Sequence, residues 1–269
     1  MVFDKILAKI IDANIKSTLS NNQHGGRHNR STTTAKIQMA YNIKIKGYDK
    51  ILLIDLRKAF DLVNHEQIIK AIDNKIKDRF DKMILKNILR IYKYININVQ
   101  QHVIHPTRGV PQGSVFGPTL FLLTIDDIIN SLENNNNIHI QAFVDDIAIS
   151  SNTTDNLQNG YNIISLSIKK IHMEINVGEC GSLTDNPNYI IIDENTNQPI
   201  KACTQAKYLG QTINNLAETN DIILRRNYNS IAQLIHTSDT FITLKSRIKL
   251  LYKIKIYTST FINFYKWKY

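Results

Sequence analysis

Apolar residues recur at helical spacing over much of the chain. Near the N-terminus, large apolar residues stand three and four positions apart from Phe3 to Ile15, which predicts an amphipathic helix over residues 2–19. The same spacing predicts further helices over 36–46, ending in a turn at Gly47, over 65–94 as one helix or two, from near Pro118 to 133, over about 155–173 and in the C-terminal 55 residues.

Other stretches follow the patterns of β-strands. The near-continuous aliphatic run at 50–56 predicts a short buried strand, and residues 97–105 predict another. Residues 138–150 place strand-like residues on both sides of an aspartate pair, as in a β-hairpin, and a strand pair is predicted over about 188–212. Because strands and helices follow one another without regular alternation, we predict an α+β fold rather than a doubly wound sheet.

Turn-rich segments separate these elements. Residues 20–34 are mostly polar, residues 134–137 are four asparagines, and residues 107–118 hold three glycines and two prolines. The glycine and proline content predicts a tight loop immediately before the helix at Pro118.

Charge adds a prediction about partners. The 269 residues carry a net charge of +10, which favours polyanions such as nucleic acid. Residues 141–200 carry eight Asp and Glu against two Lys, net −6, and residues 221–269 carry nine Lys and Arg against two Asp, net +7. One region could therefore hold cations while the other holds phosphates, although charge runs are also typical of solvated faces.

The sequence also bears on the compartment. Its two cysteines, Cys180 and Cys203, form no CxxC motif, so neither a disulfide framework nor a zinc site is predicted. The N-terminus lacks the apolar core of a signal peptide, and no apolar run approaches 18 residues. We therefore expect an intracellular protein, in the nucleus or the cytoplasm, that is not secreted and has no membrane partner.

Three carboxylates stand where strands are predicted to end or turn. Asp55 closes the strand at 50–56, and Asp145 and Asp146 lie within the predicted hairpin. Mg²⁺ prefers such oxygen ligands, and carboxylates from two strands can converge on the pair of ions that phosphoryl transfer requires. Taken singly, each also fits a plainer reading, namely a helix cap or turn for Asp55 and a polar hairpin tip for the pair.

Several segments in this chain resemble motifs of one enzyme family. "DLRKAFDLVNH", "GVPQGSVFGP" and "AFVDD" occur in this order and resemble motifs A, B and C of reverse transcriptases, specifically those of non-LTR (LINE-type) retrotransposons. Upstream, "QHGGRHNRST" resembles the fingers motif, and downstream "KYLG" resembles the primer-grip motif. The resemblance spans about residues 5–260, and three ordered motifs make it specific.

The resemblance implies an RNA-directed DNA polymerase, a nucleotidyltransferase that adds dNTPs to the 3′ end of a DNA primer on an RNA template. It implies a right-hand architecture with an antiparallel palm sheet: partial fingers over 1–49, a palm over 50–212 with a fingers insertion at about 65–118, and a basic helical thumb over 213–269. It also implies two Mg²⁺ ions, with Mn²⁺ as an alternative.

Residue roles follow from position in the motifs. The metal ligands implied are Asp55, Asp145, Asp146 and the carbonyl of Leu56. Phe60 would exclude a 2′-hydroxyl, and its plainer reading is a core aromatic. The remaining nucleotide-binding residues implied are Arg27, Arg30, Gln112 and Gly113. The primer grip implied consists of Tyr208, Leu209 and Gly210. His65, at the end of motif A, is interpreted as structural.

The chain departs from the family pattern at several positions. Glu179 stands where motif D carries a lysine, Gly26 stands where a phenylalanine is usual, and Val144 replaces an alanine. No endonuclease domain precedes the resemblance, so we expect a polymerase core from a longer retroelement protein. A catalytically inactive RNA-binding subunit of a ribonucleoprotein is the alternative. A group II intron maturase is a third reading, less favoured because "DLRKAFDLVNH" is closer to the LINE pattern.

Overall fold

A computed structural model describes the chain from residue 15 to residue 214. The gaps in this description are 16–17, 28, 94–96, 100–101, 105, 111–114, 134, 136 and 185–188. The predicted N-terminal helix at 2–19, except for three residues, and the predicted C-terminal helices from residue 215 onward lie outside the described residues.

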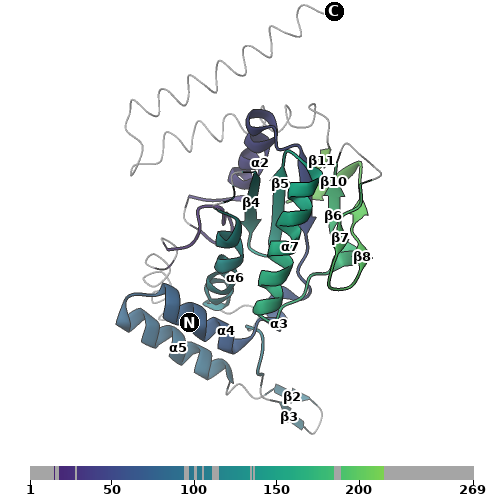
Figure 1. Cartoon of the computed structure of the whole chain (residues 1–269). Helices are drawn as coiled ribbons and strands as arrows, with labels where there is room; N and C mark the ends of the chain where they lie inside the picture. Colours follow the sequence, from purple (N-terminus) through teal and green to yellow (C-terminus); the bar gives the residue numbers. More distant parts are fainter. Residues whose placement is uncertain are drawn as a thin grey trace, which may run out of the picture. The chain divides into compact units, whose positions relative to one another are not determined.

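A five-stranded sheet forms the centre of the described part, in the order β4-β5-β1-β6-β9 (Figure 1). Its strands are β1 (Lys50–Ile54), β4 (Ile138–Phe143), β5 (Asp146–Ser151), β6 (Gly181–Leu183) and β9 (Lys201–Ala202). Neighbouring strands are antiparallel except for the parallel pair β6 and β9. The strand predicted at 50–56 and the hairpin predicted at 138–150 are both present, and they are neighbours because β1 pairs with β5.

Helices cover the sheet and extend the core. Their bounds are α2 (Thr32–Lys46), α3 (Ala59–Leu62), α4 (His65–Lys75), α5 (Arg79–Lys93), α6 (Gly117–Glu133) and α7 (Thr154–Lys170). In Figure 1, α6 and α7 lie against the sheet, while α4 packs on α6 and α5 packs on α4. The apolar run Leu120–Leu123 is buried on all sides, as expected of a helix enclosed between a sheet and other helices. This mixture confirms the predicted α+β class.

Local signals account for several boundaries. Ser31 caps α2 through a capping box with Thr34, and Gly47 ends the helix with a φ of 70°, as the predicted turn there requires. Asn64 caps α4 and Thr153 caps α7 by accepting a backbone N–H with the side chain. The predicted segment 65–94 is two helices, α4 and α5.

Two strand predictions need correction. Residues 97–105 hold two short strands, β2 (Ile97–Val99) and β3 (His102–Ile104), which pair antiparallel, rather than a single strand. The segment from 188 to 212 holds β9 and two small hairpins, β7 (Ile192–Asp193) with β8 (Gln198–Pro199) and β10 (Gln205–Tyr208) with β11 (Gln211–Asn214). A local turn divides the first hairpin, because the Asp193 carboxylate accepts hydrogen bonds from both N–H and Oγ1 of Thr196.

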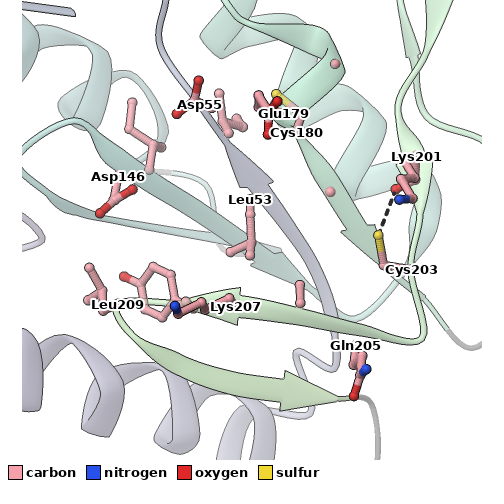
Figure 2. A pocket seen from close by; sticks show the side chains of 16 residues that line it. Leu53, Asp55, Asp146, Glu179, Cys180, Lys201, Cys203, Gln205, Lys207 and Leu209 are labelled. Atoms are coloured by element: carbon pink, nitrogen blue, oxygen red, sulfur yellow. Dashed lines mark hydrogen bonds between the residues drawn. The ribbon is translucent and has the colours of Figure 1, made fainter.

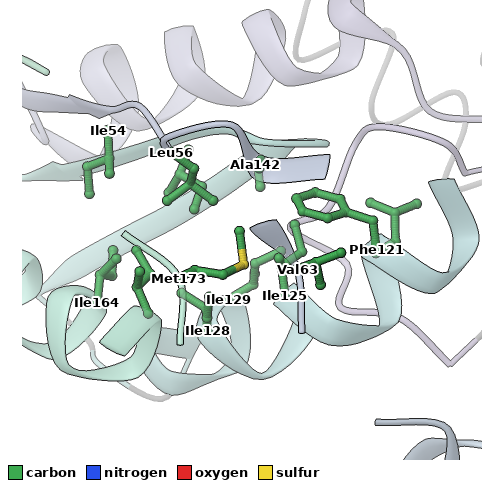
Figure 3. Close-up of a cluster of buried hydrophobic side chains, with 14 of the residues drawn as sticks. Ile54, Leu56, Val63, Phe121, Ile125, Ile128, Ile129, Ala142, Ile164 and Met173 are labelled. Carbon is green, nitrogen blue, oxygen red and sulfur yellow. The ribbon is translucent and has the colours of Figure 1, made fainter. Parts of the chain in front are cut away.

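Figure 3 shows the core between the sheet and helices α6 and α7. Its labelled members are Ile54, Leu56, Val63, Phe121, Ile125, Ile128, Ile129, Ala142, Ile164 and Met173. Asp126, on α6, is fully buried and satisfied, since it accepts hydrogen bonds from the Ser20 N–H at 2.7 Å and the Lys75 ammonium at 2.9 Å. These contacts fasten the N-terminal segment and α4 to the rigid core beneath the sheet.

No helix in the described ranges combines the length and the apolar character needed to cross a bilayer.

Two histidines, the buried His24 and the partly buried His139, are expected to make stability depend on pH in acid. Burial is the main cause that lowers the pKa of both His24 and His139 to about 4; Arg30 adds to the effect on His24 and Lys46 to that on His139. Between pH 6.5 and 4 the unfolded chain binds protons that the folded chain does not. The free energy of unfolding should therefore decrease as the pH is lowered through this range, by about 1.4 kcal/mol per pH unit for each histidine. Urea titrations from pH 7 to 4 should show a shallower fall for His139→Gln; equal slopes would contradict this assignment.

Candidate active site

Asp55 and Asp146 lie at adjacent positions on the sheet although 91 positions separate them in sequence. Asp55 directly follows β1, Asp146 opens β5, and the register places Ile54 opposite Ile147. Figure 2 shows the side chains of Asp55 and Asp146 near the ends of their strands, on the border of one pocket. Asp145 precedes Asp146 in the two-residue turn that joins β4 to β5.

The three carboxylates influence one another electrostatically. Burial, with a further contribution from the Asp55 carboxylate, raises the pKa of Asp145. Burial likewise raises the pKa of Asp146, and the charges of Asp145 and Asp55 add to it. A bound cation would relieve the repulsion.

The carboxylates at these strand ends are oxygen donors of the kind that the expected Mg²⁺ prefers. In the part of the chain that the structure describes, no group of three His, Cys, Asp or Glu side chains is arranged so that it could hold a metal ion. Mg²⁺ does not need three protein ligands, since it is commonly held by one or two carboxylates, waters and substrate phosphates. The repelling carboxylates at these strand ends therefore fit this ion.

The turn between β4 and β5 has an unusual backbone conformation. Val144 has a φ of 60°, in the left-handed region where a β-branched residue is an outlier. Phe143 pairs with Asp146, so Val144 and Asp145 form a two-residue hairpin loop whose first position is normally occupied by glycine when φ is positive there. Such strained residues persist only where the surroundings enforce them.

Asn176 holds Asp55 in place from the far side of β1. Its backbone N–H donates to the Asp55 carbonyl at 2.9 Å, and its side-chain Nδ2 donates to Asp55 Oδ2 at 3.1 Å. The neighbouring Leu56 forms a β-bridge with Ile175, which fixes the backbone on which the Leu56 carbonyl lies. Sequence reasoning did not identify Asn176. The available signal was its position three residues before Glu179, in the segment "INVGECG" at 175–181.

Loss of the Asn176 amide should weaken the binding of a divalent ion at Asp55 without unfolding the chain. In Asn176→Leu, Asp55 Oδ2 loses a donor and the carboxylate can rotate, so we expect the Kd for Mn²⁺ to rise about 10-fold, as for other residues that orient metal ligands. Asn162→Leu is the matched control, since it removes a partly exposed amide whose hydrogen bonds are to Glu194 and Gln158, away from the aspartates. Equal Kd values for the two variants would contradict the role of Asn176.

A pocket of about 380 Å³ extends from Asp55 and Asp146 to β10 and the turn after it (Figure 2). Tyr208 is buried, and its hydroxyl accepts a hydrogen bond at 2.8 Å from Gln141, a residue of β4. Leu209 and Gly210 both have positive φ, so they form the type of two-residue turn that suits a hairpin. The three residues expected to hold a primer thus lie on β10 and its turn, and two of them, Tyr208 and Leu209, line the same pocket as two of the carboxylates.

Glu179 also lines this pocket. It ends the short 3-10 helix Val177–Glu179, and Figure 2 shows it near Asp55. The residue that departs most from the family pattern therefore borders the candidate site and adds a negative group to it.

The predicted nucleotide-binding residues are placed unevenly. Phe60 is half-buried and stacks on Phe121 with ring centroids 4.5 Å apart, which is compatible with both of its readings. The Arg27 guanidinium donates to the Ser20 carbonyl within its own loop. Within the described part of the chain, the Arg30 guanidinium makes no hydrogen bond or ion pair. Gln112 and Gly113 lie outside the described residues.

His65 occupies a structural position. It is buried, and its Nε2 lies 2.7 Å from the Gly109 carbonyl oxygen, so it connects the end of motif A to the loop before α6.

The chain is similar in sequence to known proteins of one family. The profile of the family described as "Reverse transcriptase (RNA-dependent DNA polymerase)" matches residues 1–213. The chain is 34% identical over 111 residues to the COX1/OXI3 intron 2 protein of Saccharomyces cerevisiae, covering 41% of this chain and 12% of that protein. It is 27% identical over 176 residues to the retrovirus-related Pol polyprotein from type-1 retrotransposable element R2 of Nasonia vitripennis, covering 61% and 17%.

The fold has a similar counterpart among solved structures. Telomerase from Candida albicans, in complex with a fragment of telomeric RNA, superimposes with a TM-score of 0.53 at 11% identity, over 97% of this chain and 47% of that one. At this identity the likeness concerns the fold alone. The chain spans less than a fifth of the two relatives and about half of the telomerase chain.

Proposed function

The chain belongs to the reverse transcriptase (RNA-dependent DNA polymerase) family, and from this premise we propose that it is a polymerase core that extends a primer 3′ end with deoxynucleotides on an RNA template. The observation that carries the proposal is the placement of Asp55, Asp145 and Asp146 at the ends of the neighbouring strands β1 and β5 and in the turn before β5. The pocket that continues from Asp55 and Asp146 toward Tyr208 supports it, because a primer end needs space beside the metal ligands.

Divalent metal ions are general in this family. We propose Mg²⁺ here, held by Asp55 and Asp145, with the Leu56 carbonyl as a further ligand and Asp146 completing the acidic cluster. When bound, the ions supply activation of the attacking hydroxyl and stabilisation of charge on the phosphates. The chain's own part is to hold the carboxylates in place, which the hydrogen bond from Asn176 to Asp55 supports.

The remaining roles concern substrates. Tyr208, Leu209 and Gly210 would hold the primer end, and the hydrogen bond from Gln141 keeps the Tyr208 hydroxyl fixed. Arg30 would contact nucleotide phosphates, and it suits this role better than Arg27, whose guanidinium is bonded within its loop. Phe60 would contact the sugar edge. Gln112 and Gly113 against the nascent base pair, the basic thumb, and an intracellular location remain predictions.

Primer extension tests this function. The full chain is incubated with a DNA primer annealed to an RNA template, dNTPs, and either Mg²⁺ or Mn²⁺. We expect extension that depends on template, dNTP and metal and that exceeds extension with ribonucleotides. Absence of extension with either metal, in a sample that binds the primed template, would overturn the polymerase and favour the second candidate.

That second candidate is a non-catalytic RNA-binding subunit of a ribonucleoprotein. The observation that favours it is Glu179 in the pocket, because a negative side chain opposes a departing pyrophosphate. It predicts salt-dependent RNA binding that survives loss of both Asp55 and Asp145.

Reversing the charge at residue 179 separates the candidates. In Glu179→Lys the ammonium would stabilise the negative charge that develops on the leaving group, so we expect kcat for nucleotide addition to rise about 10-fold. Glu174→Lys is the matched control, since it changes net charge equally at an exposed residue, outside the pocket, whose ion pair with Arg57 is 3.3 Å long. An equal rise in kcat for both variants would indicate a general attraction of nucleic acid to added positive charge. No rise in either variant would show that Glu179 does not slow nucleotide addition.

A further inference from the structure

The strained turn that carries Asp145 is bound by one side chain from the N-terminal segment. Gln23 is completely buried. Its Oε1 accepts the Val144 N–H at 3.0 Å and the Gly25 N–H at 2.8 Å. Its Nε2 donates to the Val144 carbonyl at 3.3 Å. Both backbone polar groups of the one residue with strained φ in this turn are thus held by the same amide.

Gln23 is itself anchored by the backbone around it. It forms a parallel β-bridge with Ala142 along the outer edge of β4. The His24 N–H donates to the Ala142 carbonyl at 2.7 Å, and the Ala142 N–H donates to the Asn22 carbonyl at 2.9 Å. The amide of Gln23 therefore reaches Val144 from a fixed base rather than from a free loop.

Packing reinforces the contact. A Cβ atom built on Gly25 would lie 2.4 Å from the Val144 nitrogen and 2.5 Å from its Cγ2, so the chain passes directly against the turn. A β-branched residue with φ near 60° would relax if its surroundings allowed it. Relaxation of Val144 would rotate the next residue, Asp145, away from Asp55.

We propose that Gln23 is a positioning residue: it holds Val144 in its left-handed conformation and thereby sets the direction of Asp145. The inference rests on the proposed polymerase function, and it assigns a catalytic consequence to a residue of the N-terminal motif that contacts no reacting atom. An amide suits both contacts, because its oxygen accepts from the Val144 N–H while its nitrogen donates to the Val144 carbonyl.

Kinetics on the full chain test the proposal. Gln23→Met keeps the length of the side chain and removes both hydrogen bonds to Val144. We expect kcat for dNTP incorporation to fall about 100-fold through misplacement of Asp145, with the KM for dNTP changed less than about 2-fold. Gln38→Met is the matched control; it removes the same group from α2, where the amide donates to Asn42 Oδ1 at 3.1 Å and has no other hydrogen bond among the described residues. Equal kcat values for Gln23→Met and Gln38→Met would overturn the proposal.

A second-site change distinguishes positioning from general damage. Glycine adopts the Val144 conformation without strain. We therefore expect the double variant Gln23→Met with Val144→Gly to have a kcat at least 5-fold higher than that of Gln23→Met alone. The two residues are in contact, so the effects of the two substitutions should be coupled. Purely additive effects would overturn the proposal. Should Gln23→Met fail to fold, Gln23→Glu replaces it, since the carboxyl keeps the acceptor contacts and loses the donor; wild-type kcat there would also count against the proposal.

Hydrogen–deuterium exchange separates this inference from the proposed function. Amides of 138–151 should exchange at least 10-fold faster in Gln23→Met than in wild type or Gln38→Met. If wild type extends no primer, the polymerase proposal fails, while faster exchange at the turn still supports the structural role of Gln23. Unchanged exchange beside an active wild type overturns the role of Gln23 alone.

Discussion

Asp145→Asn is expected to lower the rate of nucleotide incorporation by about 10³-fold or more, because a neutral amide cannot replace the carboxylate proposed to bind a divalent ion, and such an ion contributes several kcal/mol to stabilising the transition state. The substitution preserves shape, so the fold should persist. Single-turnover extension of a primed RNA template measures the effect. Asp73→Asn is the control; it removes a carboxylate that pairs with Lys86 at 2.7 Å, outside the pocket.

The same substitution is expected to raise stability in the absence of metal, although it lowers activity. Burial and the Asp55 charge raise the pKa of Asp145, so its ionised form is disfavoured in the folded protein without metal. The thermal midpoint of Asp145→Asn should therefore lie above that of wild type in the absence of divalent ions. Added Mg²⁺ should raise the midpoint of wild type more than that of the variant. A fall in both activity and midpoint would instead indicate that Asp145 is structural.

Gly25→Ala is expected to damage both stability and activity. The added methyl group would meet the Val144 backbone nitrogen at 2.4 Å, and backbone atoms cannot rotate away as a flexible side chain can. Either the N-terminal segment or the turn at Val144 and Asp145 must move, at a cost of about 1–3 kcal/mol in the free energy of unfolding. We also expect incorporation to fall about 100-fold, since Asp145 follows the displaced residue.

Gly178→Ala is the control for stability. A Cβ atom there meets nothing within 4 Å, and its φ is not positive. Urea unfolding of both variants beside wild type gives the comparison. Equal unfolding free energies for Gly25→Ala and Gly178→Ala would show that the close approach at Val144 is not maintained in solution.

The departure at Gly26 has a physical explanation in the fold. Gly26 has a φ of 64°, and a Cβ atom on it would lie 2.7 Å from Leu122 Cδ1. A larger side chain here would meet α6 and would also adopt a disfavoured backbone conformation.

Sequence reasoning predicted the elements that carry strong local signals. The aliphatic run at 50–56 and the apolar flanks of Asp145 predicted β1 and the hairpin, and the resemblance to reverse transcriptases implied that they share an antiparallel palm sheet. Strand number at 97–105 was missed because "INVQQHVIH" has no glycine or proline to mark a turn. The contacts of Gln23 with Val144 and of Asn176 with Asp55 each join residues 121 positions apart. Such contacts leave no periodic or local pattern, so only three-dimensional structure reveals them.

The passage of residues 22–24 along β4 also bears on how molecules of this protein behave toward one another. An edge strand with free N–H and C=O groups is a template for pairing with another chain, and such pairing leads to aggregation. Ala142 uses both of its outward groups within the molecule. The opposite edge, β9, is a strand of only two residues that begins with an exposed lysine. The arrangement that steadies the turn at Val144 thus also protects part of the sheet from self-association.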